Sequence, residues 1–308
     1  MDPAMKRELR FEEAEPVFTL RLYDGTRWEL WADADTASRV TRFARILGLS
    51  SLDGSPVDRR LLFSLHGPCR GSRDPAGGWV TKNLRVIRLH YHPEEPVIHC
   101  EMGPDRQDVL EIFKLQNALY PIYEAAQEKG GVPIHGALIE RDGAAIVIAA
   151  RGGTGKSTCC LRVPRPWNPL CDDDTLIVRR AGGQGYAAHP FPTWSRFADE
   201  SCRDSWNVQD GLPLKAILFL ERAEQRDSII PIKKFEAAAR ALPLPSHMLN
   251  DLWFDLELDD YRRQRATFFQ NVTTLLNEVP CYLLRATLNG AFWKKIERCV
   301  MRGRRSDQ

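Results

Sequence analysis

The sequence "AARGGTGKSTCC", residues 149–160, follows directly on the apolar run Ala144–Ile148. Its three glycines, Gly152, Gly153 and Gly155, let the backbone turn so that several N–H groups point inward. Such a loop between a strand and a helix surrounds phosphate groups with N–H donors. The types and spacing of these residues therefore predict a nucleotide-binding loop.

The end of the loop carries the residues that contact phosphate and metal in such sites. In the pattern GxxxxGK[ST] the lysine reaches the β- and γ-phosphates, and the hydroxyl that follows binds Mg²⁺. These roles fall on Lys156 and Ser157, while Ala150 stands in the first glycine position. We expect ATP and Mg²⁺ as cofactors. The predicted nucleotide-binding residues are Gly152, Gly153, Thr154, Gly155, Lys156, Ser157 and Thr158.

An acidic cluster, Asp172, Asp173 and Asp174, begins 16 residues after Lys156 and leads into the apolar segment Thr175–Val178. One carboxylate at such a strand start can bind Mg²⁺, and another can accept a proton from an attacking hydroxyl. A solvated acidic loop is the alternative. The apolar residues on both sides indicate partial burial and favour a functional role.

Further candidates lie outside the loop and the acidic cluster. His135, in "PIHGAL", interrupts an apolar strand that we expect to pair with the strand before the loop. It is either a structural histidine or an active-site residue near the γ-phosphate. Glu221 ends the apolar run "AILFLE", where many nucleotide-hydrolysing proteins carry an aspartate. Candidates for stabilising a transferring phosphoryl group are Arg196, Arg222 and Arg240.

Strand and helix patterns alternate along the chain and indicate an α/β (α+β) fold. Residues 1–105 are predicted to form a smaller N-terminal α+β domain that opens with a hairpin around Asp24. Residues 106–308 are predicted to form the domain that holds the glycine loop. We expect two long helical stretches, at about 107–128 and about 247–278.

Composition narrows the classes of partner. The 308 residues include 43 Lys and Arg against 41 Asp and Glu, and a net charge of +2 does not favour nucleic acid. No stretch approaches 18 uncharged apolar residues, so we expect no membrane span. The eight cysteines form no CxxC pair and no zinc-binding spacing, which suggests idle thiols in a reducing cytoplasm.

The segment "HGALIERDGAAIVIAARGGTGKST", followed by Asp173 and Asp174, resembles the kinase domain of HPr kinase/phosphorylase. The resemblance implies a P-loop fold of the type shared with phosphoenolpyruvate carboxykinases. It also implies that Asp173 is catalytic, that Asp174 is a second carboxylate, and that His135 lies in the active site. The signature that follows this region in HPr kinases is not recognisable, which leaves phosphorylase activity and HPr itself open.

The chain from about residue 110 onward is similar to a shorter branch of HPr-kinase-like proteins that are encoded with peptide-modification cassettes. The matching segments include "LYPIYEAAQEKGGVPIHGALIE", "GGTGKSTCC", "LCDDDTLIV" and "HPFPTWS". The SynChlorMet cassette C proteins are most similar, and the lasso-peptide kinases are more distant. The N-terminal third does not resemble the N-terminal domain of HPr kinase.

Together, these features predict a cytoplasmic ATP- and Mg²⁺-dependent kinase that acts on a Ser or Thr hydroxyl of a ribosomal precursor peptide or small protein. We expect Lys156 to bind the phosphates, Ser157 and Asp174 to hold Mg²⁺, Asp173 to act as base, and His135 to orient Asp173 or the γ-phosphate. One alternative is a P-loop ATPase in which Glu221 activates water, and another is a nucleotide-binding peptide-recognition module. A homo-oligomer is left open, and the N-terminal domain is the expected peptide-recognising part.

Overall fold

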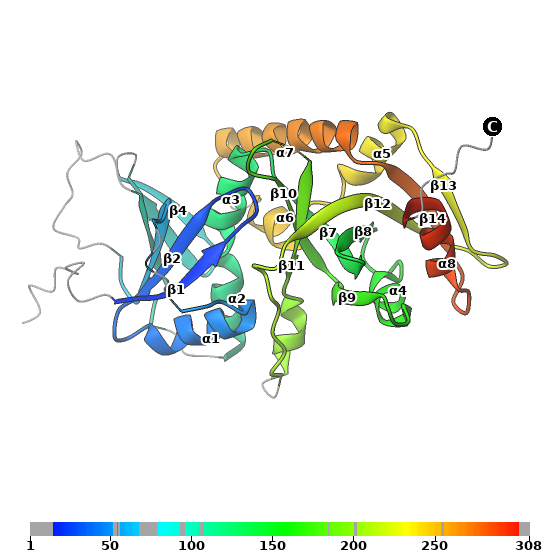
Figure 1. Cartoon of the computed structure of the whole chain (residues 1–308). Helices are drawn as coiled ribbons and strands as arrows, with labels where there is room; N and C mark the ends of the chain where they lie inside the picture. Colours follow the sequence, from blue (N-terminus) through cyan, green and yellow to red (C-terminus); the bar gives the residue numbers. More distant parts are fainter. Residues whose placement is uncertain are drawn as a thin grey trace, which may run out of the picture.

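The computed structural model describes residues 15–51, 54, 56–67, 79–92, 96–104, 108–183, 185–199, 202–253 and 256–301. Within these residues the chain forms two β-sheets, one of six strands and one of eight, together with α-helices. Figure 1 shows the N-terminal sheet beside the larger sheet, with one long helix running along the top of the molecule. The expected mixed α/β class is confirmed.

The smaller sheet consists of β1 (Glu15–Arg21), β2 (Arg27–Ala32), β3 (Arg59–Ser64), β4 (Val80–Leu84), β5 (Ile87–Tyr91) and β6 (Val97–Glu101). Its strand order is β1-β2-β3-β6-β5-β4, so β1 and β4 are its edges. The expected hairpin is confirmed in β1 and β2. Gly25 turns the chain with a φ of 82°, and the Asp24 carboxylate accepts a hydrogen bond from the Thr26 N–H at 2.8 Å.

The helices of this half are α1 (Ala37–Leu47), α2 (Asp108–Asn117) and α3 (Tyr120–Glu128). The single helix expected over about 107–128 is therefore two helices, and its first residues lie outside the described part of the chain. Pro121, in the first turn of α3, has no N–H to donate to the carbonyl of Asn117, so a continuous helix is disfavoured there.

The larger sheet consists of β7 (Val132–Arg141), β8 (Ala144–Ala149), β9 (Asn168–Cys171), β10 (Asp174–Arg179), β11 (Tyr186–Phe191), β12 (Leu212–Arg222), β13 (Ser228–Pro231) and β14 (Cys281–Ala286). The order is β11-β10-β7-β8-β12-β14-β13, and β9 pairs with β7. Strands β8, β12 and β14 are parallel. The expected pairing of the His135 strand, β7, with β8 is confirmed, and β10 pairs antiparallel with β11.

The helices that follow are α4 (Lys156–Arg162), α5 (Lys234–Ala241), α6 (His247–Trp253), α7 (Leu258–Glu278) and α8 (Phe292–Ile296). The helical stretch expected over about 247–278 is interrupted, because Glu257 has an extended backbone (ψ 148°) and α7 begins after it. Helix α7 buries Phe268, Val272 and Leu275. Its Asn271 amide donates to the carbonyl of Gln127 at 2.7 Å, which joins α7 to the end of α3.

Buried side chains from both sheets belong to one continuous hydrophobic cluster. Phe43 of α1 stacks on Trp194, which follows β11, with ring centroids 6.3 Å apart. The backbone N–H of Trp206 donates to the carbonyl of Ile46 at 2.8 Å. The two regions predicted as separate domains therefore share a core.

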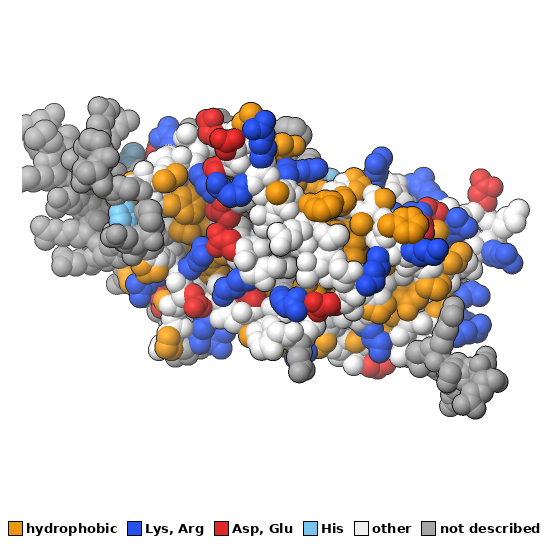
Figure 2. All heavy atoms as spheres, turned by 90° about the horizontal axis from the view of Figure 1, so that it is seen from above, with side chains coloured by type: hydrophobic (Ala, Val, Ile, Leu, Met, Phe, Trp, Pro, Cys, Tyr) orange, Lys and Arg blue, Asp and Glu red, His pale blue; other side chains and the backbone are white. Residues whose placement is uncertain are grey.

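The surface carries mixed side chains. On the face shown in Figure 2, Lys and Arg side chains are scattered among apolar and uncharged ones and form no single stripe. No helix in the described ranges is long and apolar enough to span a membrane. The cysteines within the same ranges are free thiols.

His189 of β11 joins the two halves of the molecule and has no exposed surface. Its Nδ1 lies 2.7 Å from the carbonyl oxygen of Val208, so this nitrogen must carry the proton and donate. Its Nε2 then accepts a hydrogen bond from the N–H of Tyr23 at 3.2 Å. Burial lowers the pKa of His189 from 6.5 to about 4. The neutral ring is thus the form that fits this position.

We predict that His189→Ala lowers the free energy of unfolding by about 2–4 kcal/mol at pH 7, because it leaves the buried carbonyl of Val208 and the partly buried N–H of Tyr23 unpaired. The stabilisation from His189 is present above pH 6.5 and is lost as the pH falls through about 4. The difference between wild type and variant, measured by urea unfolding, should therefore shrink over this window. The exposed His66→Ala is the control. A difference that is constant with pH would contradict the prediction.

Candidate active site

Strand register brings residues distant in sequence to one end of the larger sheet. Asp174 at the start of β10 lies opposite His135 in β7, and Gly136 lies opposite Ala149 at the end of β8. The N–H of Gly136 also donates to the carbonyl of Asp173 at 3.0 Å. The acidic cluster, His135 and the start of the glycine loop are therefore neighbours.

The glycine loop turns as the sequence pattern predicts. Gly153 and Gly155 have φ values of 73° and 114°, which side-chain-bearing residues rarely adopt. The space above Gly152, Gly153 and Gly155 is open, because a Cβ added at any of them would meet nothing within 4 Å. Helix α4 starts at Lys156 directly after the loop. The loop thus presents an unobstructed backbone surface to a ligand.

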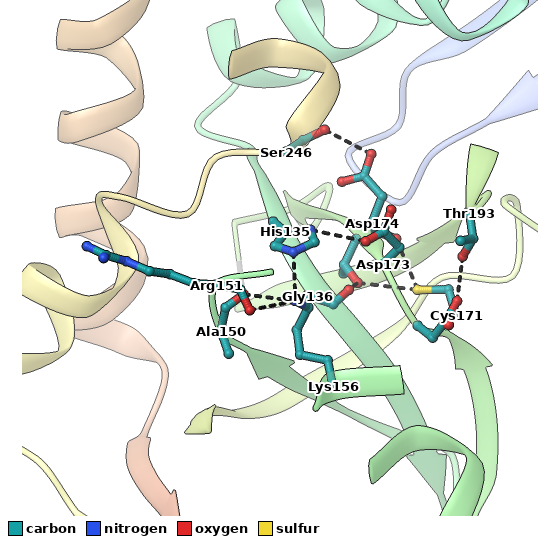
Figure 3. A network of polar contacts seen from close by, with 12 residues as sticks. His135, Gly136, Ala150, Arg151, Lys156, Cys171, Asp173, Asp174, Thr193 and Ser246 are labelled. Carbon is teal, nitrogen blue, oxygen red and sulfur yellow. Dashed lines mark hydrogen bonds and ion pairs between the residues drawn. The ribbon is translucent and has the colours of Figure 1, made fainter. Parts of the chain in front are cut away.

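Lys156 is buried, and its ammonium group points back into the loop (Figure 3). Its Nζ lies 2.9 Å from the carbonyl oxygen of Ala150, 3.3 Å from that of Arg151 and 2.6 Å from Nε2 of His135. An ammonium has three N–H donors and no acceptor, so these three groups take all of them. Burial lowers the pKa of Lys156, and the nearby Asp173 and Asp172 oppose that shift.

His135 connects the lysine to the acidic cluster. Because Lys156 donates to Nε2, the proton of the neutral ring is on Nδ1, which lies 3.3 Å from Oδ1 of Asp173. Figure 3 shows the ring between the two side chains. Burial, followed by the charges of Lys156 and His247, lowers the pKa of His135 to about 3. The ring is therefore neutral around pH 7.

Asp173 has a side chain that is 33% exposed, so solvent or a substrate can reach it. Burial raises its pKa, and the charges of His247 and Lys156 only partly offset that effect. A carboxylate with a raised pKa is a stronger base than an ordinary aspartate. The structure thus brings together Lys156, His135 and Asp173, which the sequence predicted as catalytic.

Asp172 is the carboxylate that lies beside Ser157. Burial raises its pKa, but hydrogen bonds from Thr193 and Ser157 and the charge of Arg196 outweigh burial, so the pKa lies below its ordinary value. Arg196, in the short helix Trp194–Ala198, approaches the Asp172 carboxylate at 3.5 Å. Asp172 therefore remains ionised next to a hydroxyl, which is a donor set that suits Mg²⁺.

Asp174, which we expected to lie beside Ser157 as a Mg²⁺ ligand, contacts Tyr123 and Ser246 instead. Its Oδ2 accepts hydrogen bonds from the hydroxyls of Tyr123 at 3.0 Å and Ser246 at 2.9 Å, and the residue is only 6% exposed. Burial raises its pKa to about 7. The hydroxyls of Ser157 and Thr158 are on the exposed side of α4. The contacts of the described residues thus join Ser157 to Asp172 rather than to Asp174.

The segment Leu244–His247 also belongs to the site, and no sequence pattern predicted its contribution. This segment lies against β7: the N–H of His135 donates to the carbonyl of Leu244 at 3.0 Å, and the N–H of Ser246 donates to that of Pro133 at 3.1 Å. It places Ser246 on Asp174 and places the His247 ring 3.8 Å from the ring of His135. These residues are more than 100 positions from His135, and no local pattern marks them.

The candidate arginines have different positions. Arg222 holds the carbonyls of Gly153 and Thr154, and so supports the loop. Arg240 and Arg285 both pair with Glu221, at 2.8 and 3.2 Å. Hydrogen bonding to Arg240 is the main cause that lowers the pKa of Glu221.

A cleft of about 530 Å³ lies between the glycine loop, the end of β12 and α5. Its lining includes Thr154, Phe219 and Arg240. This cleft borders the glycine loop, and none of the three aspartates of the acidic cluster lines it.

Fold and site together define a mixed α/β protein with a glycine loop between a strand and a helix, and with a lysine–histidine–aspartate chain beside it. A family model for the SynChlorMet cassette protein ScmC matches residues 98–302. The chain therefore belongs to the ScmC family. The match covers the whole larger sheet and begins within β6. A comparison with curated proteins gives no match.

We predict that Asp174→Asn stabilises the protein at pH 8. The pKa of Asp174 is raised from 3.8 to about 7, so its contribution to stability is present below pH 3.8 and is lost as the pH rises through 7. The Asn amide oxygen can still accept both hydroxyl hydrogen bonds without burying a charge. The gain should be on the order of 1 kcal/mol or more in urea unfolding at pH 8 and should diminish toward pH 4. Asp142→Asn, on an exposed turn, is the matched control.

Proposed function

We propose that the chain is an ATP- and Mg²⁺-dependent kinase of the HPr-kinase-like type, which transfers the γ-phosphoryl group to a Ser or Thr hydroxyl of a peptide. The observation that carries this proposal is the placement of Lys156 and Asp173 on the two ring nitrogens of His135, beside an open glycine loop. Phosphoryl transfer requires a cation at the phosphates and a base at the acceptor, and this arrangement provides both.

In this proposal Lys156 exchanges its loop partners for phosphate oxygens. The ammonium now donates to Ala150, Arg151 and His135, and the β- and γ-phosphates offer stronger, charged acceptors. The loop N–H groups bind the remaining phosphate oxygens. Arg222 keeps the carbonyls of the loop turned away from the phosphates, because it holds those of Gly153 and Thr154.

Asp173 accepts the proton of the attacking hydroxyl. Its partial exposure lets an acceptor approach, and burial has raised its pKa toward the range in which a base is effective. His135 Nδ1 lies 3.3 Å from Oδ1 of the Asp173 carboxylate. This ring keeps the base at a fixed distance from the lysine.

Ser157 and Asp172 are the residues that would hold Mg²⁺. A hydroxyl and an ionised carboxylate are the oxygen ligands that this ion prefers, and Ser157 is close enough to Asp172 to help lower the pKa of that carboxylate. The chemistry that Mg²⁺ supplies when bound is neutralisation of the phosphate charge. Asp174, which we expected in this position from the sequence, binds Tyr123 and Ser246 instead.

A P-loop ATPase with Glu221 as the activating base is the second candidate. The ion pairs with Arg240 and Arg285 and the lowered pKa of Glu221 make it a weak base. These contacts favour the kinase over the ATPase. A nucleotide-binding peptide-recognition module remains as a third candidate, without transfer to an acceptor.

The peptide acceptor is proposed on two grounds. The chain resembles proteins encoded with peptide-modification cassettes, and β4 is an edge of the smaller sheet that pairs only with β5 among the described residues. Val80 on that strand is 52% exposed, and a sheet edge can take a peptide as an additional strand. The N-terminal half would then bind the peptide, and the larger sheet would phosphorylate it.

We predict that Asp173→Asn slows phosphoryl transfer by about 10²- to 10⁴-fold, the usual loss when a general base is removed. Nucleotide affinity should change little, because the side chain keeps its size and Lys156 is intact. Lys156→Ala should instead weaken nucleotide binding, measured by calorimetry. Equal losses of affinity in both variants would show that Asp173 is not the base.

We also predict that Asp172→Asn raises the Mg²⁺ concentration needed for half-maximal transfer, because it removes the ionised carboxylate at Ser157. Asp174→Asn should leave that concentration within a few-fold of wild type. The measurement is a Mg²⁺ titration of the initial rate at saturating ATP. The opposite order of effects would assign the metal to Asp174.

The proposed function is tested by incubating a precursor peptide from the same gene neighbourhood with the protein and Mg²⁺-ATP. Mass spectrometry should detect one added phosphate on Ser or Thr, and Lys156→Ala should add none. Steady ATP hydrolysis without a phosphorylated peptide would favour the ATPase. Tight nucleotide binding without any turnover would favour the recognition module.

A further inference from the structure

Three side chains beside the glycine loop have the composition of a transition-metal site. A ring nitrogen of His135, a ring nitrogen of His247 and a carboxylate oxygen of Asp173 all lie within 4.8 Å of one another. The 3.3 Å between His135 Nδ1 and Asp173 Oδ1 is already close to the spacing of two ligands on one ion, about 3.4 Å for a tetrahedral zinc. The exposed His247 needs only a small side-chain movement to complete the set.

The Nδ1 atom of His135 lacks a partner that would account for its burial. It is inaccessible to solvent and makes no hydrogen bond of good geometry to any described residue, although Asp173 is near. Buried polar atoms are nearly always satisfied, so an orphaned one needs an explanation. A metal ion between His135, Asp173 and His247 would supply the missing partner. The partly exposed Asp173 and the exposed His247 leave a path for the ion from solvent.

Lys156 determines which nitrogen of His135 can bind a metal. Its ammonium lies 2.6 Å from Nε2 and can only donate, so the ring proton is held on Nδ1, the atom that faces Asp173. A metal ion on Nδ1 requires that proton to move to Nε2. Lys156 at Nε2 disfavours this move, and the positive charge of the ammonium opposes a second cation nearby, so both effects weaken metal binding without abolishing it.

We propose that His135, Asp173 and His247 bind a divalent zinc-type ion, and that Lys156 controls the site through Nε2 of His135. Two imidazoles and one carboxylate favour zinc over magnesium, since magnesium prefers oxygen ligands alone. This site is separate from the magnesium ligands Ser157 and Asp172.

The metal site itself does not depend on the proposed kinase activity. Only the coupling between metal binding and nucleotide binding rests on the proposed function. When phosphates draw Lys156 away, Nε2 takes the ring proton and Nδ1 becomes a free ligand. Nucleotide and zinc would then strengthen each other's binding by the same factor, as thermodynamic linkage requires. Because zinc would occupy the carboxylate proposed as base, the loaded site would hold nucleotide without transferring phosphate.

The test is a zinc titration of the full-length protein without nucleotide, read by competition with a chelating dye. Co²⁺ is the spectroscopic probe, because a low-coordinate Co²⁺ site has visible absorption bands. Wild type should bind one ion per chain. His247→Ala should bind the ion at least about tenfold more weakly, since replacing even a residue that only supports a metal ligand lowers metal affinity by that factor. His66→Ala, an exposed histidine outside the cluster, should match wild type.

Lys156→Met should bind zinc more tightly than wild type, within the range of about 5- to 150-fold that is typical of coupled sites. Thermal unfolding verifies that each variant is folded, and Lys156→Gln replaces the Met variant if that one is not. Equal zinc affinity in wild type and His247→Ala would overturn the site. An unchanged zinc affinity after replacement of Lys156 would overturn the proposal that Lys156 regulates the metal site. Neither result bears on the nucleotide assay, so the two proposals can fail separately.

Discussion

The buried ammonium of Lys156 is the constraint on which the arrangement of the site depends. A charge at 5% exposure needs its donors satisfied, and Lys156 satisfies them with two loop carbonyls and one histidine nitrogen. These bonds determine the shape of the loop before a ligand binds and set the tautomer of His135. Any ligand that attracts the lysine must therefore release His135 as well.

The three consecutive aspartates show how environment divides the roles of one residue type. Asp172 is surrounded by hydrogen-bond donors, which lower its pKa. Burial raises the pKa of Asp173 and the pKa of Asp174. In the function proposed above, Asp172 is the charged metal ligand and Asp173 is the base, while Asp174 joins Tyr123 to Ser246. The three side chains have different surroundings because Asp172 and Asp173 precede strand β10, whereas Asp174 is its first residue.

Local patterns predicted the parts of the site that lie close together in sequence. The hairpin β7–β8, the glycine loop and the start of β10 follow from strand periodicity and turn residues, and strand register then brings His135, Lys156 and Asp173 together. The pattern could not tell which aspartate lies at Ser157, because three identical residues at a strand start carry no periodicity. It also missed Ser246 and His247, whose position depends on tertiary packing against β7. The helix breaks at Pro121 and Glu257 were missed for a similar reason, since helical composition continues across both.

The shared core gives the N-terminal half a physical connection to the chemistry. The hairpin β1–β2 reaches β11 through the hydrogen bond from the Tyr23 N–H to His189, and β11 pairs along its whole length with β10. In that pairing Asp174 lies opposite Phe191, whose ring is 5.0 Å from the ring of Tyr123, itself a donor to Asp174. These contacts form a continuous connection from the smaller sheet, proposed above as the peptide-binding part, to the carboxylates. Because β10 is hydrogen-bonded on both sides, to β11 and to β7, it is the strand that connects β11 to the acidic cluster and to the hydrogen bond between Gly136 and Asp173.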